Sequence, residues 1–352
     1  MKICNIGKII TTKIDGATLT RDNYISTENM LSNCGGVVTA TSVPSTKVTC
    51  FSKCDVLLSN IRPYFKKVWF ARFDGGCSND VICIRTNDKD CLSHYLYYAL
   101  STDSFIDSFS ASSKGTKMPR GDKNALLSYE IPDKTIDEQQ HIVDILGSID
   151  NSIENNEKFV ANLETYAISK YQEITKGISD FITLGEIVDI YDSKRKPLSS
   201  RERESRKGNY RYYGATGVLD YVNDYLFDGE YVLLAEDGTV IDENGYPIVQ
   251  LVTGQFWVNN HAHIMQATAG YTNYSLYVAL KKLSVNTAVT GAVQLKINQA
   301  NLCALELPQI DENKLSEFNQ EIEPLFLKII QIRAEVEKLN ELKQLYLHKF
   351  FG

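Results

Sequence analysis

The feature of this sequence that most constrains its fold is a phrase that occurs twice, at residues 115–132 and 291–308. The two copies align without a gap. The positions with matching chemistry are Gly115/Gly291, Arg120/Lys296, Leu126/Leu302, Glu130/Glu306, Ile131/Leu307 and Pro132/Pro308. The triplet VLL recurs at the same spacing, starting at Val56 and Val232. Stacked repeats have periods of roughly 20 to 50 residues, so this much longer period predicts two tandem copies of a whole domain.

Further matches occur at slightly different spacings, as expected when loops change length while strands and helices persist. Residues 6–9 (IGKI) align with residues 184–187 (LGEI). At a slightly longer spacing than that of the repeated phrase, the matching pairs are Tyr97/Tyr277, Ala99/Ala279 and Leu100/Leu280. These matches extend the duplication over both halves of the chain.

The composition is typical of a globular protein with two hydrophobic cores. The chain has 352 residues, of which 43% are hydrophobic and 23% charged. The formal net charge is −7, but residues 1–133 carry 16 basic and 13 acidic side chains and are net positive. The acidic total therefore does not exclude a nucleic-acid partner, because local clustering of charge decides such binding.

The cysteines and the apolar segments exclude several other classes of protein. Seven of the eight cysteines precede residue 92, and their spacings do not form the paired CxxC motifs of a zinc site. We expect free thiols and no bound metal. The N-terminus lacks the apolar stretch of a signal peptide, and no apolar run reaches membrane-spanning length. The sequence therefore predicts a cytoplasmic protein without a membrane partner.

Helical periodicity follows the first copy of the repeated phrase. Apolar residues recur at steps of three and four from Ile142 onward. Thr135 and Glu138 are a candidate capping box, and Gly177 stands where a C-terminal cap belongs. We expect a helix of about 40 residues within 134–177, roughly 60 Å long.

A second periodic stretch, residues 315–350, keeps its three- and four-residue steps over five heptads. This pattern is typical of a coiled coil and predicts a long helix within 310–352. Pro324 interrupts the stretch, and we expect it to kink or restart the helix near Glu323.

The two long helices are expected to pair with each other as an antiparallel coiled coil. The alternative is that each helix packs in the core of its own domain, but helices of this length outrun a domain of about 130 residues. The predicted order is a globular domain (1–133), a long helix (134–177), a second globular domain (178–309) and a second long helix (310–352). An antiparallel pair predicts pseudo-two-fold symmetry between the copies.

Each globular half is predicted to be a mixed domain, so that the fold class is α+β. Strand-like composition occurs at residues 56–60, 67–73, 81–85, 231–235 and 258–266, and helical composition at residues 93–100 and 273–283.

The common catalytic motifs are missing from the sequence. We find no phosphate-binding GxxxxGK[ST], no GxGxxG opening a helix, no GxSxG and no HExxH. The Asn/Asp-Pro-Pro-aromatic motif expected of an amino-group methyltransferase is also missing. His261 and His263 alternate as on a strand, and we expect hydrogen bonding at a surface rather than catalysis or metal binding.

Several segments resemble the specificity subunits of type I restriction–modification enzymes. The segment IPDKTIDEQQHIVDILGSIDNSIENN at residues 131–156 is similar to their conserved helix, and residues 54–80, 210–238 and 256–265 resemble parts of their recognition domains. The resemblance covers nearly the whole chain, in the order target-recognition domain, long helix, target-recognition domain, long helix. The second copy lacks the EQQ phrase and has Pro324 instead, so contacts made through that phrase are not expected on both helices.

This resemblance implies a non-catalytic subunit that reads a bipartite sequence in double-stranded DNA. It also implies docking to methyltransferase (modification) subunits, and through them to a restriction/translocase subunit. No cofactor is expected in this chain, because S-adenosylmethionine, ATP and Mg belong to the partner subunits. The duplication then supplies two readers of one duplex, with the helices setting their spacing.

The candidate DNA-binding residues of the first copy come from a basic and aromatic segment and from the repeated phrase. Such clusters suit neutralisation of phosphates, and an arginine can in addition read guanine. The candidates are Ser59, Asn60, Arg62, Tyr64, Lys66, Lys67, Lys114, Thr116, Lys117 and Arg120. A solvated basic face is the alternative.

The candidates of the second copy combine cations, aromatic residues and groups that can read base edges. They are Lys194, Arg195, Lys196, Tyr212, Tyr213, Thr216, Glu236, Asp237, Asn260, His261, Gln294 and Lys296. Glu236 and Asp237 suit a cytosine amino group, and Asn260 or His261 a purine edge.

Two other functions stay open at this point. The first is a DNA-binding scaffold or regulator of another defence system that uses the same architecture. The second is an enzyme with an unrecognised site, for which methylation of DNA by the pure protein would be the sign.

Overall fold

The computed structural model describes residues 1–87, 89–115, 117–242, 244–291 and 294–352. The chain divides into two compact units. The first unit is Met1–Asn155 together with Val336–Gly352, and the second unit is Asn156–Glu335. Each unit therefore contains one globular half and a part of both long helices. The domain boundaries given by the sequence analysis stay predictions.

The two long helices are present where the sequence predicts them. They are α5 (Ile136–Thr175) and α9 (Glu312–Phe351), each of 40 residues. The predicted capping box precedes α5: the backbone N–H and the hydroxyl of Thr135 donate to Glu138 at 2.9 and 3.0 Å. Gly177 follows the helix with a φ of +80°, the left-handed conformation that ends helices without strain in glycine.

The predicted restart of the helix at Pro324 is wrong. The helix continues across it from Glu312 to Phe351. Proline removes one backbone hydrogen bond, but Ile322 and Phe326 on either side are both fully buried in the core of the second unit. Packing of these neighbours outweighs the local cost of proline.

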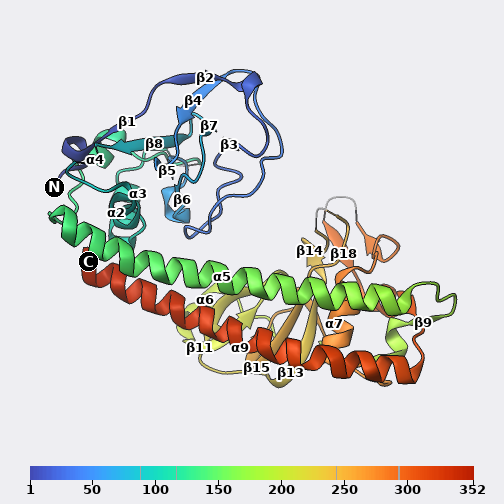
Figure 1. The fold of residues 1–352 in the computed structure, drawn as a ribbon. Coiled ribbons are helices and arrows are strands. Elements are labelled where there is room, and N and C mark those ends of the chain that lie inside the picture. Colours follow the sequence, from blue (N-terminus) through green and yellow to red (C-terminus); the bar gives the residue numbers. More distant parts are fainter. Residues whose placement is uncertain (88, 116, 243, 292–293) are drawn as a thin grey trace. The chain divides into compact units, whose positions relative to one another are not determined.

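Ion pairs show that α5 and α9 run antiparallel, as predicted. Asp150 of α5 pairs with Lys343 of α9 at 2.6 Å in the first unit. In the second unit Glu164 pairs with Arg333 at 2.7 Å, and Lys170 with Glu321 at 3.8 Å. Rising numbers in α5 thus meet falling numbers in α9, and the two helices lie side by side (Figure 1).

The apolar stripes of the helices also enter the domain cores, which the sequence analysis disfavours. In the second unit, Leu315, Phe318, Ile322, Phe326 and Ile329 of α9 belong to the main core cluster. In the first unit, Ile142 and Leu146 of α5 and Leu347 of α9 belong to the main core cluster. Each helix therefore serves the helix pair and a domain core at once.

The two globular halves share one sheet topology, which confirms the tandem duplication. The strand order is β1-β8-β5-β6 in the first unit and β10-β16-β13-β15 in the second, with antiparallel neighbours in both. The central strands β5 (Val56–Ser59) and β13 (Phe227–Ala235) contain the repeated VLL triplet. The repeated helices α2 (Ser93–Leu100) and α7 (Asn273–Lys281) contact these strands.

The first unit adds a second sheet, ordered β2-β4-β7-β3. Its remaining elements are α1 (Ile3–Ile6), β1 (Gly7–Ile9), β2 (Lys13–Asp15), η1 (Gly16–Thr18), β3 (Tyr24–Ile25), β4 (Lys47–Phe51), η2 (Pro63–Phe65), β6 (Val68–Phe70), β7 (Gly75–Cys77), β8 (Val81–Thr86), α3 (Asp103–Ala111) and α4 (Lys123–Ser128).

The second unit instead extends its main sheet by β11 and β12 and adds two small sheets, β14-β18-β17 and β19-β9. Its remaining elements are β9 (Phe181–Thr183), η3 (Leu184–Glu186), β10 (Val188–Ile190), η4 (Asp192–Lys194), α6 (Ser200–Ser205), β11 (Lys207–Tyr213), β12 (Val218–Val222), β14 (Asp237–Gly238), β15 (Val249–Val258), β16 (Ala262–Ala267), β17 (Val289–Thr290), β18 (Leu295–Ile297), α8 (Gln299–Cys303) and β19 (Glu306–Pro308).

Two predicted strands are wrong in their extent. The strand predicted over residues 67–73 is limited to β6 (Val68–Phe70). The sequence predicts a single strand over residues 258–266, but Val258 ends β15 and Ala262 begins β16. The intervening NNH segment makes a turn in which Asn259 accepts a hydrogen bond from the backbone N–H of His261 at 2.8 Å. Asparagine competes with strand hydrogen bonds in this way, and the apolar pattern on both sides conceals the turn.

Candidate nucleic-acid interface

The repeated phrase folds back onto the segment that follows the central strand, in the same way in both units. In the first unit the backbone of Arg120 forms antiparallel β-bridges with Ile61 and with Lys114. In the second unit the backbone of Lys296 pairs with Asp237 on one side and with Thr290 on the other, in an antiparallel sheet. Each of these positions matches its counterpart at the spacing of the repeated phrase. The duplication therefore places Arg120 and Lys296 at equivalent points of the two units.

In the first unit this pairing brings together most of the predicted basic residues. We call residues 60–67, 114, 115 and 117–120 the first basic loop. Lys66 pairs with Asp103 at 2.7 Å and Lys114 with Asp122 at 3.6 Å. Arg120 pairs with Asp80 at 2.8 Å.

Other side chains of the first basic loop face solvent. Arg62 and Lys117 are exposed, and the described residues give neither of them an ion pair. Tyr64 and Phe65 are also exposed, with ring centroids 4.8 Å apart. Lys67 is less available, because its ammonium donates to the carbonyl of Thr27 at 2.6 Å.

The backbone of the first basic loop is held in an uncommon conformation. Arg62 and Lys66 have φ values of +48° and +53°, in the left-handed region that costs non-glycine residues about 1–2 kcal/mol each. The N–H of Arg62 donates to the carbonyl of Pro119 at 2.8 Å, and its carbonyl accepts from Phe65 at 3.0 Å. These contacts fix the direction in which the loop presents its cations. Gly238 takes the place of Arg62 in the second unit, with a φ of +80°.

In the second unit, the residues next to Asp237 and Lys296, which match Ile61 and Arg120, form a largely buried network of charged side chains. Arg195 donates to Glu236 at 2.5 Å and to the carbonyl of Ala262 at 2.8 Å. It also lies 3.4 Å from Asp192. The side chains of Arg195 and Glu236 are each only 13% exposed. Lys296 reaches the second oxygen of Glu236 at 3.1 Å.

His263 is a further, buried member of this network. Its Nδ1 lies 2.5 Å from Asp192, its Nε2 lies 2.8 Å from the carbonyl of Ile297, and the side chain is 1% exposed. The expectation of a hydrogen-bonding role is confirmed for this histidine, but its location at a surface is wrong. His261 is exposed and lies 2.6 Å from Asp237.

The network determines the ionisation of Glu236. Burial raises the pKa of this carboxyl group, but the hydrogen bond from Arg195, the neighbouring His263 and the hydrogen bond from Lys296 lower it by more. The net result is a pKa below the ordinary value for glutamate. Glu236 is therefore held as a carboxylate, which keeps it a strong acceptor for Lys296.

Asp192, Glu236 and His263 place ligand-type atoms within 4.8 Å of one another. Such a set can in principle hold a divalent cation. Arg195 and Lys296, however, already supply two positive charges to the two carboxylates. The described geometry is therefore that of an ion-pair network.

Several predicted DNA-binding residues are buried and have structural contacts. Ser59 is 1% exposed and donates to the carbonyl of Ile61, and Tyr212 is 1% exposed and donates to and accepts from the backbone of Leu198. Asn60 and Tyr213 are each 8% exposed. In the free protein these four side chains are buried.

The remaining candidates are exposed or lie outside the description. Lys194 stacks over Tyr191 at 4.8 Å from the ring centroid. The other exposed candidates are Lys196, Thr216, Asn260 and Gln294. Thr116 lies outside the described residues. Whether any of these side chains binds DNA stays a prediction.

The sequence analysis does not include three residues that contact the predicted DNA-binding side chains: Asp80, Asp192 and His263. Each has a partner distant in sequence: Arg120 for Asp80, and each other for Asp192 and His263, so no local motif marks these contacts. In the structure Asp80 takes the place that His261 has in the second unit, because their carbonyls accept from the backbone N–H groups of Asn60 and Glu236 at 2.8 and 2.9 Å.

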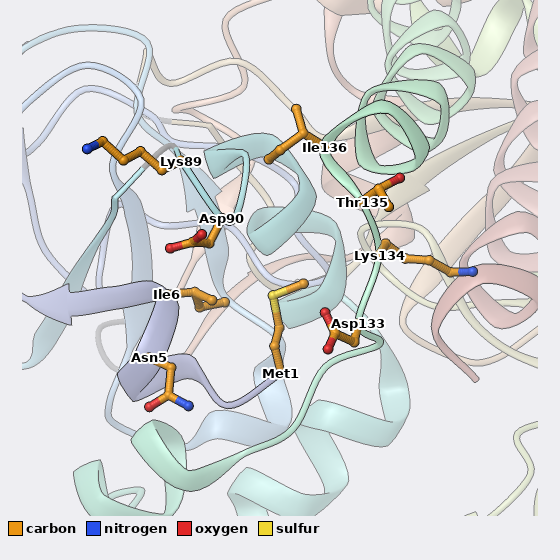
Figure 2. Close-up of a pocket in the computed structure, with 9 residues that line it drawn as sticks. All are labelled: Met1, Asn5, Ile6, Lys89, Asp90, Asp133, Lys134, Thr135 and Ile136. Atoms are coloured by element: carbon orange, nitrogen blue, oxygen red, sulfur yellow. The ribbon is translucent and has the colours of Figure 1, made fainter.

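A pocket in the first unit lies at the start of α5 (Figure 2). Its lining residues are Met1, Asn5, Ile6, Lys89, Asp90, Asp133, Lys134, Thr135 and Ile136. Two lysines and two aspartates leave it without a dominant charge, and it contains none of the predicted DNA-binding residues.

No described helix is long and apolar enough to cross a membrane.

The shared sheet topology and the equivalent positions of Arg120 and Lys296 define a protein built from two equivalent α+β domains in tandem. The model of the type I restriction modification DNA specificity domain matches residues 2–165 and 179–344. The two matches cover most of the chain. The chain therefore belongs to this family, and it contains two copies of the domain.

Known relatives agree with this assignment. A Haemophilus influenzae protein named as type I restriction enzyme specificity subunit S.HindORF215P is 38% identical over 125 residues, 36% of this chain and 31% of the relative. The Methanocaldococcus jannaschii type I restriction enzyme MjaIX specificity subunit is 24% identical over 300 residues, 74% of this chain and 69% of the relative.

The fold has a counterpart among solved structures. The S subunit of a type I restriction–modification system from M. genitalium matches 100% of this chain and 95% of its own, with a TM-score of 0.58 and 17% identity. At this identity the likeness concerns the fold. It supports the arrangement of two mixed domains and two long helices.

Proposed function

We propose that this chain is the non-catalytic DNA sequence-recognition subunit of a type I restriction–modification complex. Each domain binds one half of a bipartite target in double-stranded DNA. The observation that carries this proposal is the equivalent placement of Arg120 and Lys296, on the same backbone pairing and next to the same central strand. Family membership gives the class of protein, and the paired loops give two candidate contact surfaces of matching construction.

The chemistry of the loops suits a division of labour between phosphates and bases. Exposed cations such as Arg62 and Lys117 suit phosphate oxygens, which fix position but carry little sequence information. Arginine can also bind guanine through two hydrogen bonds. The two domains differ in these side chains, so two different half-sites are expected.

Catalysis and its cofactors are assigned to partner subunits. Methyltransferase subunits dock on this chain and bring S-adenosylmethionine, and a restriction/translocase subunit brings ATP and Mg. The complex works in the cytoplasm. The ion pairs of Glu236 with Arg195 and Lys296 support a recognition role for this chain, because they engage this carboxylate rather than leave it as a free acid or base.

The test of this proposal is to map methylated bases in cells that carry the complete gene set. We expect a split motif with two short defined parts around a fixed run of unspecified bases, which disappears when the gene for this chain is deleted. A continuous motif would contradict recognition by two domains. No methylation in the presence of working methyltransferase subunits would contradict the proposed function.

Replacing Lys117 or Arg120 by Ala should weaken DNA binding by the first domain. If the side chain meets a phosphate, all sequences should lose affinity alike, and the slope of log K against log salt should shrink by about 0.9. If Arg120 reads a base, its loss should cost about 1–3 kcal/mol on the target alone. Titrations of labelled duplexes over a salt series distinguish these outcomes.

Lys8→Ala is a matched control, since Lys8 is an exposed lysine on β1 of the same unit and outside the first basic loop. It should leave affinity unchanged. Wild-type affinity in both Lys117→Ala and Arg120→Ala would remove the first basic loop from the interface.

A further inference from the structure

In both units, a carboxylate holds the cation that the repeated phrase supplies. Arg120 pairs with Asp80 at 2.8 Å, and Lys296 pairs with Glu236 at 3.1 Å. Both cations remain accessible, with side chains 56% and 48% exposed. A cation at the predicted DNA surface thus has an acidic partner in the free protein.

The two carboxylates come from different places in the fold. Asp80 directly precedes β8, whereas Glu236 directly follows β13. The position equivalent to Glu236 in the first unit is Asn60, which has no charge. The two domains therefore reach the same ion pairing through different residues, which indicates that the pairing itself has a role beyond the shared backbone scaffold.

Each ion pair competes with DNA for its cation. A phosphate group and a carboxylate present similar oxygen acceptors to a guanidinium or ammonium group. Because both side chains of the Arg120–Asp80 pair are partly exposed, the pair is weak enough for Arg120 to exchange its carboxylate partner for a phosphate. A contact between Arg120 and DNA then requires breaking this pair, and Asp80 in addition repels the approaching phosphates.

We propose that Asp80 and Glu236 are specificity-determining residues that suppress binding to non-target DNA. Each carboxylate occupies its cation until a target supplies enough further contacts to offset the broken ion pair. On non-target DNA the cation stays with its carboxylate, so one phosphate contact is lost, whereas on the target the further contacts offset the cost of moving the cation to the DNA. This proposal rests on the proposed DNA-recognition function and adds a mechanism of discrimination to it.

The test uses Asp80→Asn in the full chain, because Asn keeps the shape of Asp80 without its charge. The probe is a labelled duplex of mixed sequence, titrated by fluorescence anisotropy over a series of KCl concentrations. We expect Asp80→Asn to bind this duplex about two- to five-fold more tightly at low salt. The slope of log K against log salt should steepen by about 0.9, since one more cation meets a phosphate.

A double substitution separates this mechanism from a general change in charge. In an Arg120→Gln background, Asp80→Asn should have little further effect, because the cation that it releases is missing. An equal gain with and without Arg120 would show that the carboxylate acts only through long-range repulsion, and would overturn the proposal. Unchanged or weaker binding of Asp80→Asn to the mixed duplex would overturn it as well.

Glu130→Gln is the control for loss of one negative charge. Glu130 pairs with Lys2 at 3.7 Å and is 71% exposed, outside the first basic loop. It should leave duplex affinity and salt slope unchanged, and thermal unfolding should show that all variants are folded. If the wild-type chain shows no salt-dependent binding to any duplex, the proposed function itself fails. If the wild type binds and Asp80→Asn does not differ, only the present inference fails.

Discussion

Leu347→Ala is expected to destabilise the first unit by about 2–5 kcal/mol, although the whole second unit separates residue 347 from Met1–Asn155 in sequence. Leu347 is 3% exposed and belongs to the main core cluster of the first unit. Near it in sequence, Phe351 contacts Tyr95 with ring centroids 5.0 Å apart, and Lys343 pairs with Asp150. The end of α9 thus completes a core formed mainly by the N-terminal half.

The two tryptophans allow each unit to be followed separately. Trp69 is buried in the first unit and Trp257 in the second, and the chain has two tryptophans in total. In a Trp257→Phe background, fluorescence during urea unfolding reports on the first unit alone. Leu347→Ala should lower the midpoint of this transition.

Leu345→Ala provides the matched control, because Leu345 is on the same helix and 68% exposed. It should change the free energy of unfolding by no more than about 0.5 kcal/mol. Equal effects of the two substitutions on the Trp69 signal would show that α9 does not contribute to the core of the first unit.

The duplicated fold is predictable from the sequence because its apolar residues carry that information locally. The VLL triplets lie in the central strands β5 and β13, and their burial makes them intolerant of polar replacements. The capping box at Thr135 and the glycine at residue 177 also act on adjacent backbone, so their patterns are readable.

The partners of charged residues are not predictable in the same way. Asp192 and His263 lie 71 residues apart in sequence, and only the antiparallel pairing of β10 with β16 brings them together. The basic neighbours of Arg195 in the sequence predict a contact with DNA, whereas the structure pairs it with acidic side chains. A sequence shows that a side chain is charged, but the fold decides whether its partner is solvent, a ligand or another side chain.

The predicted aromatic residues illustrate the same limit. Tyr64 is 55% exposed, whereas Tyr212 is 1% exposed and packs with Leu198 and Trp257. Both tyrosines stand next to basic segments and look alike in sequence. Their difference follows from the sheet, because Tyr212 lies on β11, between β15 and β12, and Tyr64 lies in a turn beyond a strand end.

Arg195→Met is expected to destabilise the second unit by about 3–5 kcal/mol, because it leaves Glu236 and Asp192 as poorly compensated, largely buried carboxylates. Methionine keeps much of the volume of the arginine stem, so loss of charge dominates the effect. In a Trp69→Phe background, the fluorescence of Trp257 follows the unfolding of this unit.

Lys194→Met is the control for Arg195→Met, since Lys194 is the adjacent, exposed cation. It should alter the free energy of unfolding by less than about 1 kcal/mol. The pair of variants also separates the structural role of Arg195 from the DNA contact that the sequence suggested. Unchanged stability of Arg195→Met together with lost duplex binding would assign Arg195 to DNA, whereas a large loss of stability assigns it to the network that holds Glu236 and, through it, Lys296.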